Sequence, residues 1–341
     1  MSEKKTLIVG AGAIGGTLAV LMKDAGYAPD VLEVFPGAAK EISEKGLHLT
    51  GAKGEKYAYP TAYASADELV KSYDYAIVAV KYLDLETAVK SILPFLHEKS
   101  LVVGMQNGVC TAELAELVGK DRAVGCMIGF GATKHSATDV EMTSSGEMFI
   151  GTLDGGASPE LEYLCRMYNA VIRTRITQCL INKQYSKLLI NCCTNSVAAI
   201  TGKTLGEIFD DGRAQDIILA VAREGMRIAK AQGISVPKYG ALLDYRLLML
   251  SDAEWYNGIF KYILKTVGKR KYASIKPSTL QSLLRGEKTE IDIFNGYLVR
   301  VAAEKGVDVP VNALLTKMIR EIENGEREMT SDNLDAFRGL V

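Results

Sequence analysis

The sequence predicts an α/β protein in which a doubly wound, mostly parallel sheet is followed by an all-helical domain. In the first half of the chain, apolar runs of strand length alternate with stretches of helical periodicity, the pattern of a parallel sheet with helices on its faces. From about residue 160 the strand pattern fades and helical periodicity dominates. We place the boundary near residue 178, which predicts domains of residues 1–178 and 179–341.

The first predicted element is a short apolar strand, Thr6–Val9, followed directly by a glycine-rich turn and a helix that runs to about Gly26. Strand, glycine turn and helix in this order are the context that the dinucleotide-binding fingerprint requires. The turn consists of Gly10, Ala11, Gly12, Ala13, Ile14 and Gly15. Its first glycine permits a tight turn, its second lets the backbone approach a pyrophosphate, and its third lets helix and strand pack closely. Because helix N-termini attract phosphate, the sequence predicts a Rossmann-type cofactor site at residues 10–15.

The other elements of the first domain follow in order. Strands are expected at residues 30–35, 75–80, 101–105, 123–130 and 147–152, with helices around 84–96 and 111–118. The runs at 75–80 and 101–105 are continuously apolar, as expected for strands that are covered on both faces. A ligand is expected beyond the carboxyl ends of the strands, where the helical domain closes over the cofactor.

Seven helices are expected in the second domain, separated by glycine and proline residues. Their predicted ranges are 179–200, 213–232, 238–250, 252–268, 278–285, 290–305 and 311–323. The polar end of the chain, residues 325–341, is expected to be loosely held.

Three polar side chains, Lys187, Asn191 and Asn195, are spaced four residues apart in the first of these helices. Each step of four turns only about 40° around a helix, so the three side chains line one stripe. Their neighbours are mostly apolar, which predicts a largely buried helix in which an ammonium and two amides would be costly without partners. We therefore expect the stripe to face a cleft. A cationic proton donor beside two amides suits a substrate with a carbonyl and a carboxylate or hydroxyls.

Composition excludes several classes of function. The 341-residue chain is 48% hydrophobic and has a net charge of −1, which offers no basic field for nucleic acid or an anionic membrane surface. No apolar run approaches the length of a membrane span, and no signal peptide is expected, since a strand pattern begins at Thr6. The six cysteines lack metal-ligand spacing, so no metal is expected. A reduced, cytoplasmic setting is the simplest account.

An ordered set of motifs runs along nearly the whole chain. Its members are Gly10–Gly15, Val80–Lys81, Gln106–Gly108, Lys187–Asn191 with Asn195, Lys276–Ser278 and Thr289–Asp292. With this set the chain resembles the ketopantoate reductase (2-dehydropantoate 2-reductase) family. The spaced lysine and asparagines followed by Thr-Glu-Ile-Asp are much more specific than the glycine turn. The resemblance implies an oxidoreductase that reduces a 2-oxo acid, 2-dehydropantoate, to pantoate with NADPH in pantothenate biosynthesis.

The resemblance also implies roles for individual residues. The family's catalytic lysine falls on Lys187, whose ammonium would stabilise the developing alkoxide and donate the proton. The catalytic glutamate falls on Glu290, which would orient Lys187 or bind substrate; the alternative is a carboxylate that only caps a helix start. Lys81 and Asn107 match cofactor positions. The matching substrate positions are Asn107, Lys187, Asn191, Asn195 and Ser278. For Ser278, a helix N-cap role is the alternative.

The chain departs from the family where a basic residue commonly receives the 2′-phosphate of NADP, because that place is Pro36. We place Glu33 short of the end of the second strand, so that no acid stands at its tip. Lys81 persists, and NADP is therefore expected, with NAD as the alternative cofactor. The long segment Arg246–Arg270 leaves the exact substrate open.

Two other functions are left open by the sequence. One is a reductase of another branched 2-oxo acid that uses the same lysine, and the other is a cofactor-binding sensor that has lost catalysis. Retention of Lys187, Asn191, Asn195 and Glu290 together argues against the sensor, which needs only the N-terminal fingerprint. The expected partner is a small-molecule 2-oxo acid, and a homodimer is left open.

Overall fold

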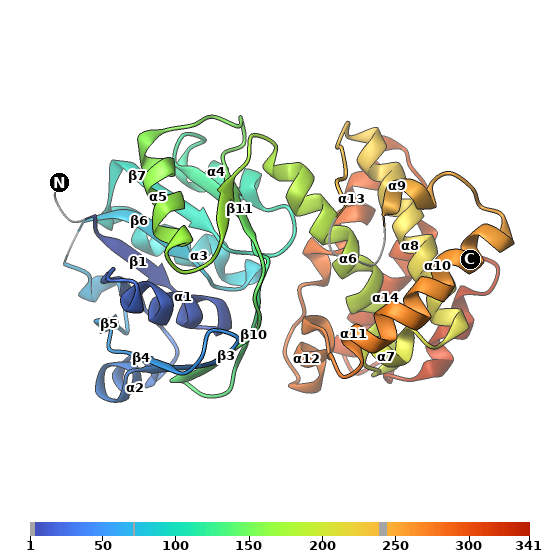
Figure 1. Ribbon diagram of the computed structural model, residues 1–341, viewed down its shortest axis with the longest axis horizontal. Helices are drawn as coiled ribbons and strands as arrows, with labels where there is room; N and C mark the ends of the chain where they lie inside the picture. Colours follow the sequence, from blue (N-terminus) through green and yellow to red (C-terminus); the bar gives the residue numbers. More distant parts are fainter. Residues whose placement is uncertain (1–3, 71, 239–243) are drawn as a thin grey trace. The chain divides into compact units, whose positions relative to one another are not determined.

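The computed structural model describes residues 4–70, 72–238 and 244–341 (Figure 1). The chain divides into two compact units, Met1–Ile181 and Asn182–Val341. The first unit contains the strands and the second is helical, so the predicted fold class is confirmed.

The first unit is built on an eight-stranded sheet with the order β12-β11-β8-β7-β6-β1-β2-β5. Its strands are β1 (Thr6–Val9), β2 (Asp30–Leu32), β5 (Ala62–Tyr63), β6 (Tyr73–Val78), β7 (Leu96–Gly104), β8 (Ala123–Met127), β11 (Met148–Gly151) and β12 (Thr174–Ile176). Every pairing in this sheet is parallel except that of β11 with β8. The strand order reverses at β1 and β6, the kind of switch point where doubly wound sheets bind ligands.

Helices cover both faces of this sheet. The helices of the first unit are α1 (Ala13–Asp24), α2 (Ala38–Lys45), α3 (Leu85–Ile92), α4 (Thr111–Val118) and α5 (Pro159–Asn169). Ile8 of β1 joins a core with residues of α1 and α5, whereas its neighbours Leu7 and Val9 join a separate core with α3 and α4. Successive strand residues point to opposite faces, so burial of both faces explains the continuous apolar runs of these strands.

A second sheet, which the sequence did not predict, flanks α1. It has four strands in the order β4-β3-β10-β9: β4 (Lys56–Ala58), β3 (Leu47–Gly51), β10 (Asp139–Ser144) and β9 (Gly131–Lys134). Residues of β3, β4 and β10 share a core with α1, and a Cβ added to Gly16 would meet Val140 Cγ1 at 3.1 Å. Because α1 has a sheet on two sides, its residues Gly15–Met22 are all buried. The strands are short, and β3 pairs with the distant β10, so local patterns carry little information about them.

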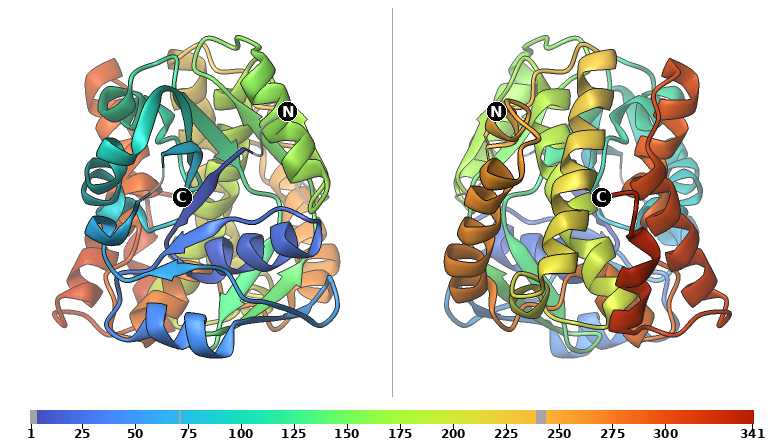
Figure 2. Two further views of the ribbon diagram at one scale, coloured as in Figure 1. Left: turned by 90° about the vertical axis from the view of Figure 1, so that its left-hand side faces the viewer. Right: turned by 90° about the vertical axis from the view of Figure 1, so that its right-hand side faces the viewer.

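The second unit is all-helical among its described residues. Its α-helices are α6 (Leu180–Thr201), α7 (Leu205–Ile208), α8 (Gly212–Ala231), α9 (Tyr245–Leu248), α10 (Glu254–Ile263), α11 (Lys269–Tyr272), α12 (Ser278–Leu284), α13 (Asn295–Lys305) and α14 (Pro310–Glu323). Helices α8 and α14 appear yellow and red in Figure 2, right, and α13 packs against both.

Three predicted helices differ from the observed ones. Of the helix expected at 238–250, residues 239–243 lie outside the described residues, and only Tyr245–Leu248 is α-helical in the remainder. The helix expected at 252–268 begins at Glu254 and passes through a π-helical turn, Leu264–Gly268, into α11. The helix expected at 290–305 begins at Asn295, after a 3₁₀ turn over Ile291–Ile293.

The expectation that residues 325–341 are loosely held is wrong. They include a 3₁₀ segment, Ser331–Phe337, and the Phe337 side chain is fully buried. The Thr330 N–H and the Asn333 side-chain amide both donate to the carbonyl oxygen of Ile200 in α6, at 3.0 and 2.8 Å. A few apolar residues and two bonds to a helix end are enough to anchor an otherwise polar segment.

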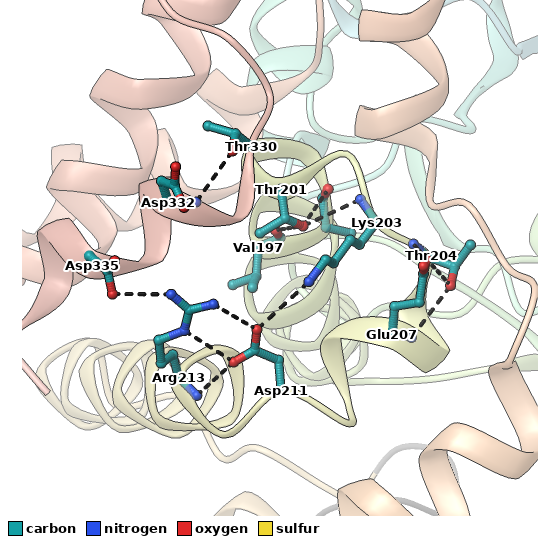
Figure 3. A network of polar contacts seen from close by, with 11 residues as sticks. Val197, Thr201, Lys203, Thr204, Glu207, Asp211, Arg213, Thr330, Asp332 and Asp335 are labelled. Carbon is teal, nitrogen blue, oxygen red and sulfur yellow. Dashed lines mark hydrogen bonds and ion pairs between the residues drawn. The ribbon is translucent and has the colours of Figure 1, made fainter.

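Ion pairs add to this anchorage (Figure 3). The Arg213 guanidinium, at the start of α8, lies between Asp211 and Asp335, at 3.2 and 3.1 Å. The Lys203 ammonium lies 3.8 Å from Asp211 on the other side of that carboxylate. Arg213 and Lys203 hold the pKa of Asp211 below its ordinary value against the opposing effect of burial. This cluster therefore belongs to the packing of the C-terminal segment on α6 and α8.

Candidate active site

The glycine-rich turn has a different constraint at each of its three glycines. Gly10 has a positive φ of 91°, and a Cβ there would lie 2.9 Å from Val80 Cγ1. A Cβ on Gly15 would lie 1.9 Å from the Gly10 carbonyl oxygen, so only glycine allows this packing of α1 on the turn. A Cβ on Gly12 would meet nothing within 4 Å. The backbone at Gly12 is therefore open to a ligand, as a dinucleotide requires.

The start of α1 is suited to phosphate. Gly12 is its N-cap residue, no side chain caps it, and its first turn contains no acidic residue. The first N–H groups of a helix have no partner within the helix, and the helix dipole places positive charge there. Residues 10–15 can therefore hold a pyrophosphate.

The other two candidate cofactor residues follow β6, which is the neighbour of β1, and β7, which is the next strand in the sheet. Lys81 follows β6 and is exposed, and Asn107 follows β7 and is partly buried. Because β1, β6 and β7 are parallel neighbours, both residues and the glycine turn lie at the same edge of the sheet. Gln106, the first residue of the Gln106–Gly108 motif, donates from Nε2 to the carbonyl oxygens of Val78 and Val80, at 3.0 and 2.9 Å. It ties the Asn107 loop to the end of β6.

An acid stands directly after β2. Glu33 is 3% exposed, and its carboxylate accepts hydrogen bonds from the N–H groups of Ala11 at 3.0 Å and Phe35 at 3.1 Å. The Lys134 ammonium lies 3.7 Å from the same carboxylate. The expected end of β2 at Phe35 is wrong, because the chain leaves the sheet where the Glu33 side chain, rather than a neighbouring strand, accepts the Phe35 N–H.

Glu33 therefore stands at the end of β2, where the sequence predicted no acid. In the dinucleotide fingerprint, an acidic residue about 20 residues past the glycines binds the ribose 2′-hydroxyl. Glu33 has this spacing, follows β2 directly and already contacts the glycine turn through Ala11. Counting from the turn, rather than judging the end of the strand from its apolar residues, would have identified it.

The stripe Lys187, Asn191 and Asn195 lies on one helix, α6. Lys187 and Asn191 are partly exposed and Asn195 is buried. Four of the six intervening positions are also buried, namely Leu188, Leu189, Cys192 and Cys193. The helix is therefore largely buried, as predicted, and two members of the stripe lie on its more accessible side.

The adjacent cysteines of α6, Cys192 and Cys193, are free thiols. Both are buried, and burial raises the pKa of each thiol well above its ordinary value. A protonated, buried thiol is not a nucleophile. These residues pack as small apolar side chains, so they add no nucleophile to α6.

Ser278 lies beside the stripe. Its hydroxyl accepts a hydrogen bond from Asn195 Nδ2 at 3.4 Å, and the residue is exposed. The N-cap of α12 is Pro277, and no side chain caps this helix. The alternative N-cap role of Ser278 is therefore wrong, since Ser278 is the first residue inside the helix.

Glu290 precedes the 3₁₀ turn Ile291–Ile293 and is partly exposed. Its side chain makes no capping hydrogen bond to that turn, so the purely capping role is not observed. The segment is instead fixed by Thr289, whose N–H and hydroxyl both donate to Glu323 of α14, at 2.7 and 2.5 Å. The position of this segment is therefore set by Thr289 and Glu323 rather than by a cap from Glu290.

Within residues 4–70, 72–238 and 244–341, no group of three or more His, Cys, Asp or Glu side chains could hold a metal ion. In the same residues, no helix is both long and apolar enough to cross a bilayer.

Two family models match the chain. "Ketopantoate reductase PanE/ApbA" matches residues 6–155, and "Ketopantoate reductase PanE/ApbA C terminal" matches residues 180–323. The chain is 27% identical to a 2-dehydropantoate 2-reductase of Archaeoglobus fulgidus, over 95% of this chain and 100% of that protein. It is 25% identical to the enzyme of the same name from Aquifex aeolicus, over 94% and 97% of the two chains.

Solved structures share the fold. A PanE/ApbA family ketopantoate reductase from Ralstonia eutropha matches with a TM-score of 0.79 and 23% identity, over 94% of this chain and 99% of that one. A D-mandelate dehydrogenase in complex with NADH and anilino(oxo)acetate matches with a TM-score of 0.80 and 18% identity, over the same shares. Taken with the family matches over both units, these findings show that the chain belongs to the ketopantoate reductase family of nicotinamide-dependent oxidoreductases.

Proposed function

We propose that this protein reduces 2-dehydropantoate to pantoate in pantothenate biosynthesis, with Lys187 as the general acid. The observation that carries the proposal is the stripe Lys187, Asn191 and Asn195, whose lysine and first asparagine are partly exposed on a largely buried helix. Relatives that match over nearly the whole chain are named 2-dehydropantoate 2-reductases. Their modest identity supports the reaction class more strongly than the individual substrate.

Lys187 and Glu290 have separate roles in the proposed reaction. Residues 10–15, Lys81 and Asn107 would hold a reduced nicotinamide dinucleotide, which would supply the hydride for the carbonyl carbon. The Lys187 ammonium donates a hydrogen bond to the carbonyl oxygen, stabilises the alkoxide that forms there and gives it a proton, so that the product is a secondary alcohol. Glu290 orients Lys187 or holds a substrate hydroxyl.

The neutral side chains give the site its preference for a 2-oxo acid with a hydroxyl. Asn191 and Asn195 offer amide donors for the carboxylate, and Ser278, hydrogen-bonded to Asn195, offers a hydroxyl. Asn107 is a candidate contact for both cofactor and substrate. Neutral donors bind a carboxylate without neutralising the lysine that must supply the proton.

The cofactor proposal is NADP, with NAD accepted as well. Lys81 is exposed beyond the carboxyl end of β6 and can form an ion pair with the 2′-phosphate. Glu33 opposes this choice, because its buried carboxylate would repel a phosphate and bind a free ribose hydroxyl. Lys134 lies close enough to Glu33 to offset part of that repulsion. We therefore expect weak discrimination between the two cofactors.

Steady-state turnover with a panel of 2-oxo acids tests the proposal. The panel contains 2-dehydropantoate, its analogue without the hydroxyl, and phenylglyoxylate, each with NADPH and with NADH. We expect the highest kcat/KM for 2-dehydropantoate. Preference for a 2-oxo acid without a hydroxyl would instead support a reductase of another branched or aryl acid, and dinucleotide binding without turnover would support the sensor.

Replacement of the lysine tests the mechanism. Lys187→Ala should lower kcat by roughly 10²–10⁴, the usual worth of a general acid, with little change in dinucleotide affinity. Lys183→Ala, one turn earlier on the partly exposed side of α6, is the matched control for loss of a lysine from this helix. A Lys187→Ala enzyme with near-normal kcat would rule out the mechanism.

A further inference from the structure

One fully buried amide, that of Asn295 at the start of α13, joins three helices. Its Nδ2 donates to the backbone carbonyl oxygen of Cys192 in α6 at 3.3 Å and to Asn312 Oδ1 in α14 at 2.8 Å. Its Oδ1 accepts a hydrogen bond from the Ser196 hydroxyl of α6. Both hydrogens and the oxygen of the amide are therefore used, which fixes the side chain in one orientation.

The chain of bonds continues to α8 through Glu224. The carboxylate of this buried residue accepts from the N–H groups of Val311 and Asn312, at 3.0 and 2.9 Å, and from Asn312 Nδ2 at 2.6 Å. It thereby caps α14, whose own N-cap residue, Val309, provides no side-chain hydrogen bond. Asn312 cannot shift without leaving N–H groups of a buried helix end unsatisfied.

The direction of this network is fixed at both ends. The Glu224 carboxylate and the Cys192 carbonyl present only acceptors to the amides between them. If either Asn295 or Asn312 turned its amide over, an oxygen would face another oxygen in a site that excludes water. The network therefore specifies one arrangement of α6, α8, α13 and α14.

The two hydrogen bonds between Asn295 and α6 fix the rotation of this helix about its axis, and neither of them involves a residue of the stripe. Cys192 and Ser196 each follow a stripe residue in sequence, Asn191 and Asn195, and so lie about 100° further around the helix. A rotation of α6 that redirected Lys187 would break both contacts with Asn295.

Asn295 also anchors one end of the segment 289–295, which carries Glu290. At one end of this segment, Thr289 is bonded to Glu323, the last residue of α14. At the other end, Asn295 is bonded to Asn312 in the first turn of α14. Glu290 is thus carried by a short segment that is anchored at both ends on one helix.

We propose that Asn295 is a positioning residue for the reaction, which fixes the direction of Lys187 by fixing the rotation of α6 against the segment that carries Glu290. This inference rests on the proposed function. Asn295 is buried in the helical unit and acts through Lys187 rather than on the substrate. A displacement of about 1 Å at a reacting group can cost roughly 100-fold in rate.

Asn295→Leu, which keeps the number and branching of the side-chain heavy atoms and removes all three hydrogen bonds, is the first test. With 2-dehydropantoate and NADPH we expect a loss of roughly 10–100-fold in kcat, and an unchanged Kd for NADPH. Asn333→Leu is the matched control, because Asn333 is also a buried amide that donates to an α6 carbonyl, that of Ile200. It should lower thermal stability comparably and leave kcat close to the wild-type value.

A double variant separates positioning from general damage. In the Lys187→Ala background, Asn295→Leu should lower kcat no further, because residues that act as a unit are non-additive. The same loss in both backgrounds, or equal losses from Asn295→Leu and Asn333→Leu, would overturn the positioning role. If Asn295→Leu does not fold, Ser196→Ala removes a single bond, and a normal kcat in that variant would overturn the role.

Failure of the proposed function is recognisable separately. A normal kcat in Lys187→Ala alone refutes the proposed function, and the positioning role with it. An impaired Lys187→Ala together with a normal, folded Asn295→Leu refutes only the positioning role.

Discussion

Glu33→Gln should move the enzyme toward NADPH. The substitution keeps the size of the side chain and removes the negative charge that stands at the ribose position, directly after β2. At an effective dielectric constant of about 20, two unit charges roughly 5–6 Å apart interact with about 3 kcal/mol. The Lys134 ammonium, 3.7 Å from the carboxylate, cancels part of this repulsion, so we expect about 1.4–2.8 kcal/mol to remain.

That energy corresponds to a rise of roughly 10–100-fold in the ratio of kcat/KM for NADPH to that for NADH. The assay is steady-state turnover at constant ionic strength, since salt screens the effect. Glu41→Gln is the control, because it removes the same charge from exposed α2 in the same unit. Lys134→Ala should shift the ratio the opposite way, toward NADH. An unchanged ratio in Glu33→Gln would refute the argument that this carboxylate faces the ribose.

Three further outcomes are expected. If Glu290 works with Lys187, the losses of kcat/KM in Glu290→Gln and Lys187→Ala should be non-additive in the double variant, whereas additive losses would make Glu290 structural. The hydrogen bond from His48 to Asp139, at 3.0 Å, raises the pKa of His48 above its ordinary value, so its contribution is complete below about pH 6.5 and is lost as the pH rises through the folded-state pKa. The free energy of unfolding of wild type relative to His48→Gln should therefore fall by about 0.2–1 kcal/mol between pH 6 and pH 9, and a flat difference would contradict this. Phe337→Ala should lower the free energy of urea unfolding by about 3–5 kcal/mol, because the ring is fully buried, and a negligible change would mean that the C-terminal segment is loosely held after all.

Many strands and helices of the first unit could be predicted from local sequence patterns. Thr6–Val9 and Thr111–Val118 were predicted with their observed ends, because an apolar run in one case and a helical period in the other ends directly at a glycine, Gly10 or Gly119. The four-stranded sheet could not be predicted, since β3 and β10 are short and pair across a long stretch of chain. The pairing of β3 with β10 depends on how both strands pack on α1. A short stretch of sequence contains no information about that packing.

The candidate site was predictable to a different extent in each unit. The spacing of Lys187, Asn191 and Asn195 already places them on one side of a helix, so the sequence was sufficient there. Glu33 was misjudged because the end of β2 depends on which group accepts the Phe35 N–H. Asn295 gave no signal, since its importance comes from bonds to α6 and α14 that only the packed helices reveal.

The burial of α1 between two sheets has a consequence for how a dinucleotide binds. A helix that is packed on two sides, with Gly16 against Val140, cannot tilt or slide without opening one of those contacts. The N–H groups at its start therefore hold their directions before any phosphate arrives, and association carries little entropic penalty for ordering them. Amide hydrogen exchange in α1 should accordingly be slow in the free protein and change little when NADPH is added. Any conformational change on binding is then expected in other parts of the chain.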